Sequence, residues 1–154
     1  MVAIRRAEAS DCEVLAPLVA VFRDHLEQTE PRNDALATSL HRLLADPDTE
    51  FLIAWQDEQP LGYAQLRFRF SLWVSGLEAQ LDDLFVRTEF RARGVGARLL
   101  DASIERARAR GSRVVGLNTN EHNAEALRLY LRAGFKAERL RWSGGRQLWL
   151  EMEP

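Results

Sequence analysis

Residues 81–97 read LDDLFVRTEFRARGVGA, and this stretch decides how the chain is interpreted. An apolar strand passes into a basic loop that places Arg91, Gly94 and Gly96 in the arrangement Arg-x-x-Gly-x-Gly, just before an amphipathic helix. Glycines let backbone N–H groups approach a ligand, and the unpaired N–H groups of a first helical turn carry about half a positive charge. The stretch therefore predicts a site for the diphosphate of a ligand.

The better-known nucleotide motifs fit this stretch less well. A dinucleotide-binding fold requires a third glycine where this chain has Leu99, and no Gly-Lys-Ser or Gly-Lys-Thr of a P-loop follows. A purely structural role, in which the glycines ease a turn and the arginines keep the loop soluble, remains open at this point.

A second stretch makes the interpretation more specific. Residues 113–118 form a short apolar strand, which is followed by Asn118-Thr-Asn-Glu-His-Asn123, a helix carrying Tyr130, and Gly134-Phe135. The segments LDDLFVRTEFRARGVGARLL (81–100) and NTNEHNAEALRLYLRAGF (118–135) resemble the central motifs of the GNAT superfamily of acetyl-CoA-dependent N-acetyltransferases. Within it they are most similar to the diamine (spermidine/spermine-type) acetyltransferase branch. The order of predicted elements extends the resemblance weakly over the whole chain.

The pattern of apolar residues and turn signals predicts an α/β fold. Helices are expected from Ser10, where Ser10 and Glu13 could form a capping box, after Pro31, and from Val95 to Gly111. Further strands are expected at residues 2–6, 50–56, 61–70, 77–86, 136–142 and 147–151, with a turn at 143–145. The three middle strands make an antiparallel meander. The result is a mixed, mostly antiparallel sheet with helices on both sides, the GNAT-like layout that the resemblance implies, in a single N-acetyltransferase domain spanning residues 1–154.

Composition limits the classes of function. The chain has 154 residues, of which 46% are hydrophobic and 29% charged, with a net charge of −2, so it can bury a core and is not predicted to bind nucleic acid. The apolar run from Val14 to Phe22 contains Pro17 and is too short to span a bilayer, so a cytoplasmic protein without membrane association is expected. Lone Cys12 is assigned no chemistry, and the scattered histidines predict no metal site.

The resemblance implies that acetyl-CoA is the cosubstrate. In this family the strand before the loop pairs with the pantetheine arm, the loop and helix start hold the pyrophosphate, and residues of the following segment contact the cofactor arm. The matching positions are Leu84, Phe85, Val86, Arg91, Ala92, Arg93, Gly94, Val95, Gly96, Ala97, Asn118, Asn123 and Ala126. For Asn123 alone, a helix N-cap is the more ordinary interpretation.

The resemblance also implies two catalytic residues. Asp82 matches the acidic position that removes a proton from the amine, and Tyr130 matches the tyrosine that donates a proton to the departing thiolate. The usual residue at the first position is glutamate, so with the shorter aspartate a relaying water is expected. From the residues alone, Tyr130 is also a candidate core aromatic on the face of Leu127 and Leu131, and Asp82 a solvated strand residue whose neighbour Asp83 points the other way.

The acceptor is expected to be a small-molecule primary amine. Acidic residues on the side where the first two helices meet the middle strands favour a cationic amine such as a polyamine or amino sugar, and Trp73 or Phe70 could form an apolar wall. The acidic positions are Glu27, Glu30, Asp34, Glu78, Asp82 and Asp83. A non-catalytic acyl-CoA sensor, or an enzyme that acetylates protein N-termini or lysines, remains an alternative. The resemblance also implies a homodimer.

Overall fold

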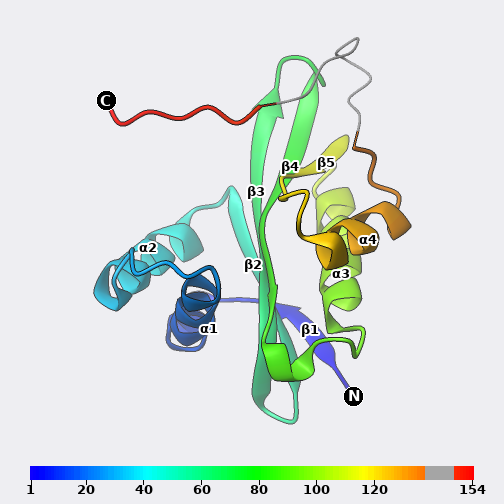
Figure 1. Cartoon of the computed structure of the whole chain (residues 1–154). Helices are drawn as coiled ribbons and strands as arrows, with labels where there is room; N and C mark the ends of the chain where they lie inside the picture. The colour runs from blue at the N-terminus through cyan, green and yellow to red at the C-terminus, as the bar shows by residue number, and fades with distance from the viewer. Residues whose placement is uncertain (138–147) are drawn as a thin grey trace. The chain divides into compact units, whose positions relative to one another are not determined.

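The protein is represented by a computed structural model that describes residues 1–137 and 148–154 (Figure 1). The chain forms two compact units, Met1–Asn120 and Glu121–Pro154. The first unit contains the sheet and three of the helices, and the second contains a shorter helix.

The first unit is built on a five-stranded sheet with strand order β1-β2-β3-β4-β5. The strands are β1 (Ala3–Arg6), β2 (Thr49–Gln56), β3 (Gln59–Ser71), β4 (Gly76–Val86) and β5 (Val114–Leu117). Neighbouring strands are antiparallel except β4 and β5, which are parallel. The predicted meander of the three middle strands is confirmed, and so is the mostly antiparallel sheet.

Helices cover both faces of this sheet, as predicted. Helices α1 (Cys12–His25) and α2 (Asn33–Ala45) lie on one face, and α3 (Val95–Ala109) lies on the other (Figure 1). Because both faces are covered, residues 49–54 of β2 are buried without alternation. The core beneath α1 and α2 includes Leu15, Leu18, Leu40, Phe51, Ile53, Tyr63 and Phe85. On α3, Val95, Leu99, Leu100, Ser103 and Ala107 are buried.

The start of α1 differs from the prediction. A short 3₁₀ turn (Ala9–Asp11) precedes the helix, and the carboxylate of Asp11 accepts a hydrogen bond from the Glu8 N–H at 2.7 Å. The same carboxylate accepts two hydrogen bonds from Arg5, both at 2.7 Å. The predicted capping box of Ser10 and Glu13 is therefore wrong. The capping box found here belongs to the 3₁₀ turn, in which the Asp11 carboxylate accepts from the N–H of the N-cap residue Glu8.

The second unit contains α4 (Ala124–Arg132). After the helix ends at Arg132, Gly134 has a φ of 97°, and the Phe135 N–H donates to the Tyr130 carbonyl at 3.0 Å. Of the two strands predicted at the end of the chain, Lys136, Ala137 and residues 148–151 are described and are not in strands. The sequence pattern alone does not make a strand, which also requires a ladder of backbone hydrogen bonds with a neighbour. The turn at 143–145 and the rest of both predicted strands lie outside the described residues.

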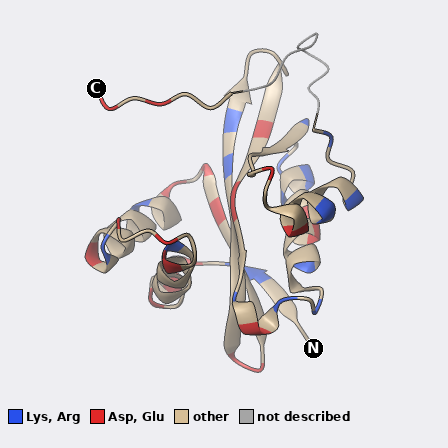
Figure 2. Cartoon of the chain, in the orientation of Figure 1, with Lys and Arg blue, Asp and Glu red and all other residues tan. Residues whose placement is uncertain are grey.

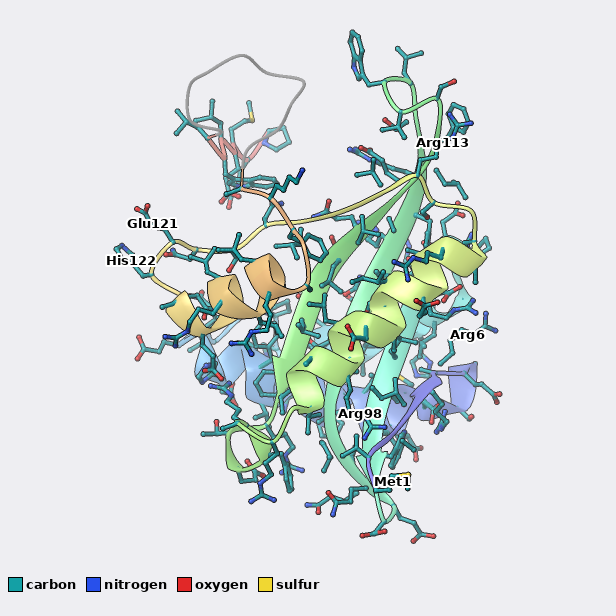
Figure 3. All side chains as sticks on the ribbon, turned by 90° about the vertical axis from the view of Figure 1, so that its right-hand side faces the viewer. Met1, Arg6, Arg98, Arg113, Glu121 and His122 are labelled. Carbon is teal, nitrogen blue, oxygen red and sulfur yellow. The ribbon has the colours of Figure 1, made fainter. Side chains whose placement is uncertain are left out.

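Arginines at the end of α3 fasten this helix to the sheet. Arg106 donates two hydrogen bonds to buried Glu50, both at 2.8 Å, and Arg110 lies 4.1 Å from the ring centroid of Phe68. Arg113 reaches back to the β3–β4 hairpin and donates to the Val74 carbonyl at 3.3 Å (Figure 3). These contacts hold three of the four arginines at 106–113 against the strands or their hairpin.

Glu50 provides a test of this attachment. Burial alone would raise the pKa of Glu50, but hydrogen bonds and charge from Arg106 lower it below the usual value. Glu50→Gln should reduce the free energy of unfolding by about 2 kcal/mol at neutral pH, because Arg106 loses its counter-charge. A lowered pKa gives stability that is present above the unfolded-state value of about 4.3 and is lost as pH falls through the folded-state value.

The difference between wild type and Glu50→Gln in urea unfolding should therefore shrink below about pH 4. Glu105→Gln, which removes a carboxylate from an exposed pair with Arg108, is the control and should change stability by less than about 0.5 kcal/mol. Equal, pH-independent effects of the two changes would contradict the structural role of Glu50.

Candidate active site

Strand β4 changes its pairing halfway along its length. Residues 78–81 of β4 pair with residues 114–117 of β5, whereas pairing with β3 continues to Val86. Within Met1–Asn120, residues 82–86 thus have no strand partner on the side that faced β5. Such an edge presents unpaired backbone N–H and C=O groups to a ligand.

The change occurs at Asp82. On the β3 side Leu66 pairs with Leu81 and Gln65 pairs with Asp83, so Asp82 is the extra residue of a β-bulge. A bulge bends its strand and re-aims a side chain, and bulges are common beside active sites. The simple alternation assumed for Asp82 and Asp83 from the sequence does not hold at this point.

Gly62 on β3 allows the close approach of the two strands beside this edge. A Cβ added to Gly62 would lie 2.2 Å from the Phe85 carbonyl oxygen and 2.9 Å from Val86 Cα. Any side chain would push β4 away from β3 at the residues expected to pair with the cofactor arm. Sequence analysis missed this residue, although a glycine inside a strand is a known signal of close backbone approach.

Gly62→Ala should therefore lower both stability and acetyl-CoA affinity. We expect a loss of about 1–3 kcal/mol in urea unfolding from the forced backbone shift, and acetyl-CoA binding weakened by about tenfold or more in calorimetric titration. The control is Gly116→Ala on β5, where the new Cβ would meet only the flexible Gln80 side chain, at 3.3 Å. Unaltered acetyl-CoA affinity in folded Gly62→Ala would contradict a role for this part of β4 in binding.

The loop after β4 ends in a strained turn at the start of α3. Ala92 and Gly94 have positive φ values of 58° and 78°. Gly94 has no atom within 4 Å of a built Cβ, so backbone conformation and not space requires glycine there. The first hydrogen bond of the helix runs from the Arg98 N–H to the Gly94 carbonyl at 3.1 Å. The N–H groups of residues 94–97 therefore have no partner within the helix and can bind an anion.

The two arginines of the loop differ in their contacts. Arg91 Nε donates to the Val86 carbonyl at 3.0 Å, and its guanidinium lies 5.8 Å from the Phe85 ring centroid. The guanidinium of Arg93 lies 5.7 Å from the ring of Phe90. Arg91 thus attaches the loop to the end of β4, and its guanidinium has further N–H groups that can bind a ligand. Its contact with the diphosphate stays a prediction, as does that of Arg93.

The carboxylates of Asp82 and Asp83 have different environments. The Asp82 side chain is 32% exposed, and its Oδ2 lies 3.9 Å from Arg67 Nε. Burial raises the pKa of Asp82, Arg67 opposes that rise and Asp83 adds to it. Asp83 Oδ2 accepts a hydrogen bond from the Tyr63 hydroxyl at 2.9 Å. Burial also raises the pKa of Asp83, and the hydrogen bond from Tyr63 opposes that rise.

Tyr63 is a second residue that sequence analysis missed. It lies in β3 and is completely buried against the rings of Phe22, Phe51 and Phe85. Burial and the charge of Asp83 hold the pKa of Tyr63 far above its ordinary value, so the hydroxyl remains a donor. A tyrosine in the otherwise apolar run Leu61 to Ala64 was the available signal, because a buried hydroxyl requires a partner.

Arginines pair with several of the acidic residues that were expected to attract a cationic acceptor. Glu78 lies 3.1 Å from Arg69 on the β3–β4 hairpin, where opposite charges lie side by side (Figure 2). The Asp34 carboxylate lies 4.0 Å from the Arg32 guanidinium. The Glu30 carboxylate accepts a hydrogen bond from the backbone N–H of Arg32 at 3.0 Å. The acidic side is therefore less negative than the sequence suggested. Among the ion pairs of the described residues, none includes Asp83.

The predicted apolar wall lies away from Asp82. Phe70 pairs with Leu77 near the end of the β3–β4 hairpin, and Trp73 lies in the connection between the two strands. Leu77 and Asp82 are five residues apart on β4, which corresponds to about 16 Å. Phe70 and Trp73 therefore do not line a pocket beside Asp82, because they lie near the far end of the long β3–β4 hairpin.

The remaining predicted site residues lie beyond β5. Asn118 directly follows β5 and is exposed. In the second unit, Asn123 is the N-cap of α4, and its side chain accepts from the Ala126 N–H at 3.2 Å. The capping interpretation of Asn123 is confirmed. The cofactor contacts proposed for all three residues stay predictions.

Tyr130 is the buried residue of α4. It is 9% exposed, and its ring packs edge-to-face against Phe135 with centroids 6.0 Å apart. Leu131, expected to share a buried face with it, is 53% exposed. Burial raises the pKa of Tyr130, so the phenol is protonated at neutral pH and can act as a proton donor.

In residues 1–137 and 148–154, no helix is long and apolar enough to cross a membrane. In the same residues, no group of three or more histidine, cysteine, aspartate or glutamate side chains is arranged to hold a metal ion.

Comparison with known proteins identifies relatives along most of the chain. The model of the acetyltransferase (GNAT) family matches residues 18–135. The chain is 33% identical to the uncharacterized N-acetyltransferase YhfO of Bacillus subtilis (strain 168), over 88% of this chain and 90% of YhfO. It is 25% identical to the aminoalkylphosphonate N-acetyltransferase of Salmonella typhimurium, over 91% of this chain and 88% of that protein. A putative acetyltransferase structure from Arthrobacter sp. FB24 superposes with a TM-score of 0.85 at 32% identity, covering 97% and 96% of the two chains.

Proposed function

The chain belongs to the GNAT acetyltransferase family, and we propose that it transfers the acetyl group of acetyl-CoA to the primary amine of a small cationic molecule. The attack is direct, within a ternary complex, and no covalent enzyme intermediate forms. One observation carries the proposal. The unpaired edge of β4 is followed by the loop that contains Arg91 and then by the four N–H groups at the start of α3 that have no partner within the helix. A site for the extended pantetheine arm is thus followed in the chain by a site for a diphosphate.

The residues of the first unit fit acetyl-CoA in chemical character. Residues 82–86 offer backbone donors and acceptors to the amides of the pantetheine arm. Residues 94–97 offer backbone N–H groups and the positive end of the α3 dipole to the pyrophosphate. When bound, acetyl-CoA supplies the activated acetyl carbon and a thiolate leaving group.

The enzyme assists two proton transfers, one from the acceptor ammonium and one to the departing thiolate. The ammonium form of the acceptor loses a proton, the neutral nitrogen attacks the acetyl carbonyl carbon, and the carbon–sulfur bond breaks as the nitrogen releases its second proton to water, from which the proton donor is restored. The products are the N-acetyl amine and free coenzyme A, whose thiolate gains a proton. We assign the first transfer to Asp82, directly or through a water, and the second to Tyr130.

The environments of these two residues support their roles. The pKa of Asp82 is raised by burial, which brings the carboxylate closer to the operating pH of a general base. Tyr130 carries its proton at neutral pH, as a phenol with an ordinary pKa does, and burial raises that pKa further. The assignment of Tyr130 rests on the resemblance of residues 118–135 to the family motif.

We infer that the acceptor is a small amine. One relative is named for a small amine, an aminoalkylphosphonate. For this chain a polyamine, diamine or amino sugar fits the carboxylates at the β4 bulge. A protein acting on such metabolites with acetyl-CoA would reside in the cytoplasm.

The proposal is tested by measuring release of coenzyme A thiol from acetyl-CoA by the purified protein. The panel of acceptors comprises diamines, polyamines, amino sugars, amino acids and short peptides. Amine-dependent release with stoichiometric N-acetyl product is expected for the small cationic amines. Release only with peptides would move the acceptor to protein N-termini or lysines. Acetyl-CoA binding without release for any amine would contradict the proposal and favour an acyl-CoA sensor.

A further inference from the structure

The Tyr63–Asp83 pair is not used by the proposed chemistry. Asp83 lies next to the proposed base, and it pairs with Gln65 of β3. Gln65 and Tyr63 are two residues apart on β3, so their side chains lie on the same face of the sheet, and Tyr63 packs in the core beneath α1 and α2. The pair therefore faces the side of the sheet that carries those helices. Its carboxylate is partly exposed, whereas its donor, Tyr63, is completely buried.

Asp83 differs from three of the other acidic residues on that side. Asp34, Glu78 and Asp82 each have an arginine within 4.0 Å. The side-chain hydrogen bond of Asp83 comes from a neutral hydroxyl, and no ion pair of the described residues includes Asp83. A largely buried carboxylate that receives one neutral hydrogen bond has lost most of its hydration without gaining a counter-charge. A cationic group from a ligand would supply that charge.

The surroundings of Asp83 favour an organic cation. Phe85, two residues further along β4, stacks on Phe22 of α1 with ring centroids 4.9 Å apart. The His25 ring lies 6.2 Å from the ring of Phe85. Phe85 itself is buried, whereas Phe22 is partly exposed and His25 is exposed. The rings of Phe22 and His25 together with an anchored carboxylate suit an alkylammonium group, whose methylene carbons contact these rings while its N–H groups bond the carboxylate.

We propose that Asp83 binds a second, non-reacting ammonium group of the acceptor, and that Tyr63 is a positioning residue that fixes the Asp83 carboxylate. This inference rests on the proposed function. The reacting nitrogen must lose its proton, and that task falls to Asp82. A carboxylate that stays hydrogen-bonded to Tyr63 serves a group that keeps its charge throughout the reaction.

Matched acceptors test this subsite. Ethylenediamine is compared with ethanolamine, and putrescine with aminobutanol, because in each pair a hydroxyl replaces one ammonium group. Wild type should prefer the diamine in kcat/KM by about tenfold or more, the value of one charge-assisted hydrogen bond. Asp83→Asn should reduce that preference to about twofold or less, mainly through KM for the diamine, with kcat for the aminoalcohols little changed.

The control is Asp101→Asn, which removes the same charge from an exposed position on α3. It should keep the preference for the diamine. A preference that survives in Asp83→Asn would overturn the inference while leaving the proposed function intact. Equal loss of kcat for diamines and aminoalcohols would also overturn it, since Asp83 would then act on the reacting nitrogen or on the fold.

Tyr63→Phe tests the positioning role. The hydrogen bond from Tyr63 lowers the pKa of Asp83, so its removal should raise that pKa. The rise in KM for putrescine on acidification, which marks protonation of Asp83, should then begin at a higher pH. The other charged or titratable groups nearby are Asp82, Arg67, His25 and Arg91, and all are unchanged in the variant. A lowered melting temperature with an unmoved limb would show that Tyr63 is only a packing residue.

Direct binding separates this inference from the proposed function. Calorimetric titration of putrescine into wild type and Asp83→Asn requires no turnover. Binding weakened by about tenfold in Asp83→Asn supports the subsite even if no acetyl transfer occurs. Equal binding by the two proteins, or no binding to wild type, overturns the subsite even if acetyl transfer to monoamines is observed.

Discussion

Asp82→Asn is expected to lower kcat by about 100- to 10,000-fold, the range of general base catalysis. Asparagine has the same shape but cannot take a proton from the acceptor ammonium. Acetyl-CoA affinity should stay nearly unchanged, because the cofactor arm is expected to contact the backbone of this part of β4. Steady-state kinetics with the best acceptor of the panel, together with calorimetric titration of acetyl-CoA, measures both quantities.

The loss in Asp82→Asn should be largest at low pH. There nearly all acceptor molecules carry a proton, whereas at high pH the free amine needs no base. The pKa of Asp82 itself is raised by burial and held down by Arg67. Arg67→Gln should therefore raise this pKa and move the acidic limb of kcat to higher pH. A wild-type rate constant in Asp82→Asn would remove Asp82 from the mechanism.

Tyr130→Phe is expected to slow the chemical step by about 10- to 1000-fold, because the departing thiolate loses its proton donor. Phenylalanine keeps the edge-to-face packing on Phe135, so the fold should be retained. Single-turnover measurements with saturating acetyl-CoA isolate the chemical step.

Phe135→Leu is the matched control for Tyr130→Phe. It disturbs the same ring contact but keeps the phenol hydroxyl, and should lower the melting temperature more than it lowers the rate. If Tyr130→Phe loses stability without losing rate, Tyr130 is a core aromatic of α4 and the proton donor must be sought elsewhere.

Local patterns predicted most of the fold of the first unit. The strong signals were the apolar strands of the meander and the glycine-rich start of α3, because each depends on residues close together in the chain. The capped 3₁₀ turn before α1 was missed because its residue Asp11 is held by Arg5, a residue of β1 whose proximity the sequence does not reveal. A single domain over residues 1–154 and a homodimer stay predictions.

The candidate site was predictable only in part. The loop from Arg91 to Ala97 follows from residue types, since few other arrangements of glycine and arginine begin a helix in this way. The roles of Gly62 and Tyr63 depend on which residues of β3 face residues 83–86 of β4. The bulge at Asp82 sets that register, and strand periodicity cannot place a bulge. The partners of the acidic residues are likewise tertiary contacts that charge counting overlooks.

The central claim is that the unpaired edge of β4 and the start of α3 form the acetyl-CoA site. Amide hydrogen exchange with and without coenzyme A tests it most directly. The account predicts that coenzyme A slows exchange at residues 82–86 and 94–97, while the amides of β1 and β2 exchange at unchanged rates. Saturating coenzyme A that leaves both segments exchanging as in the free protein would contradict the account.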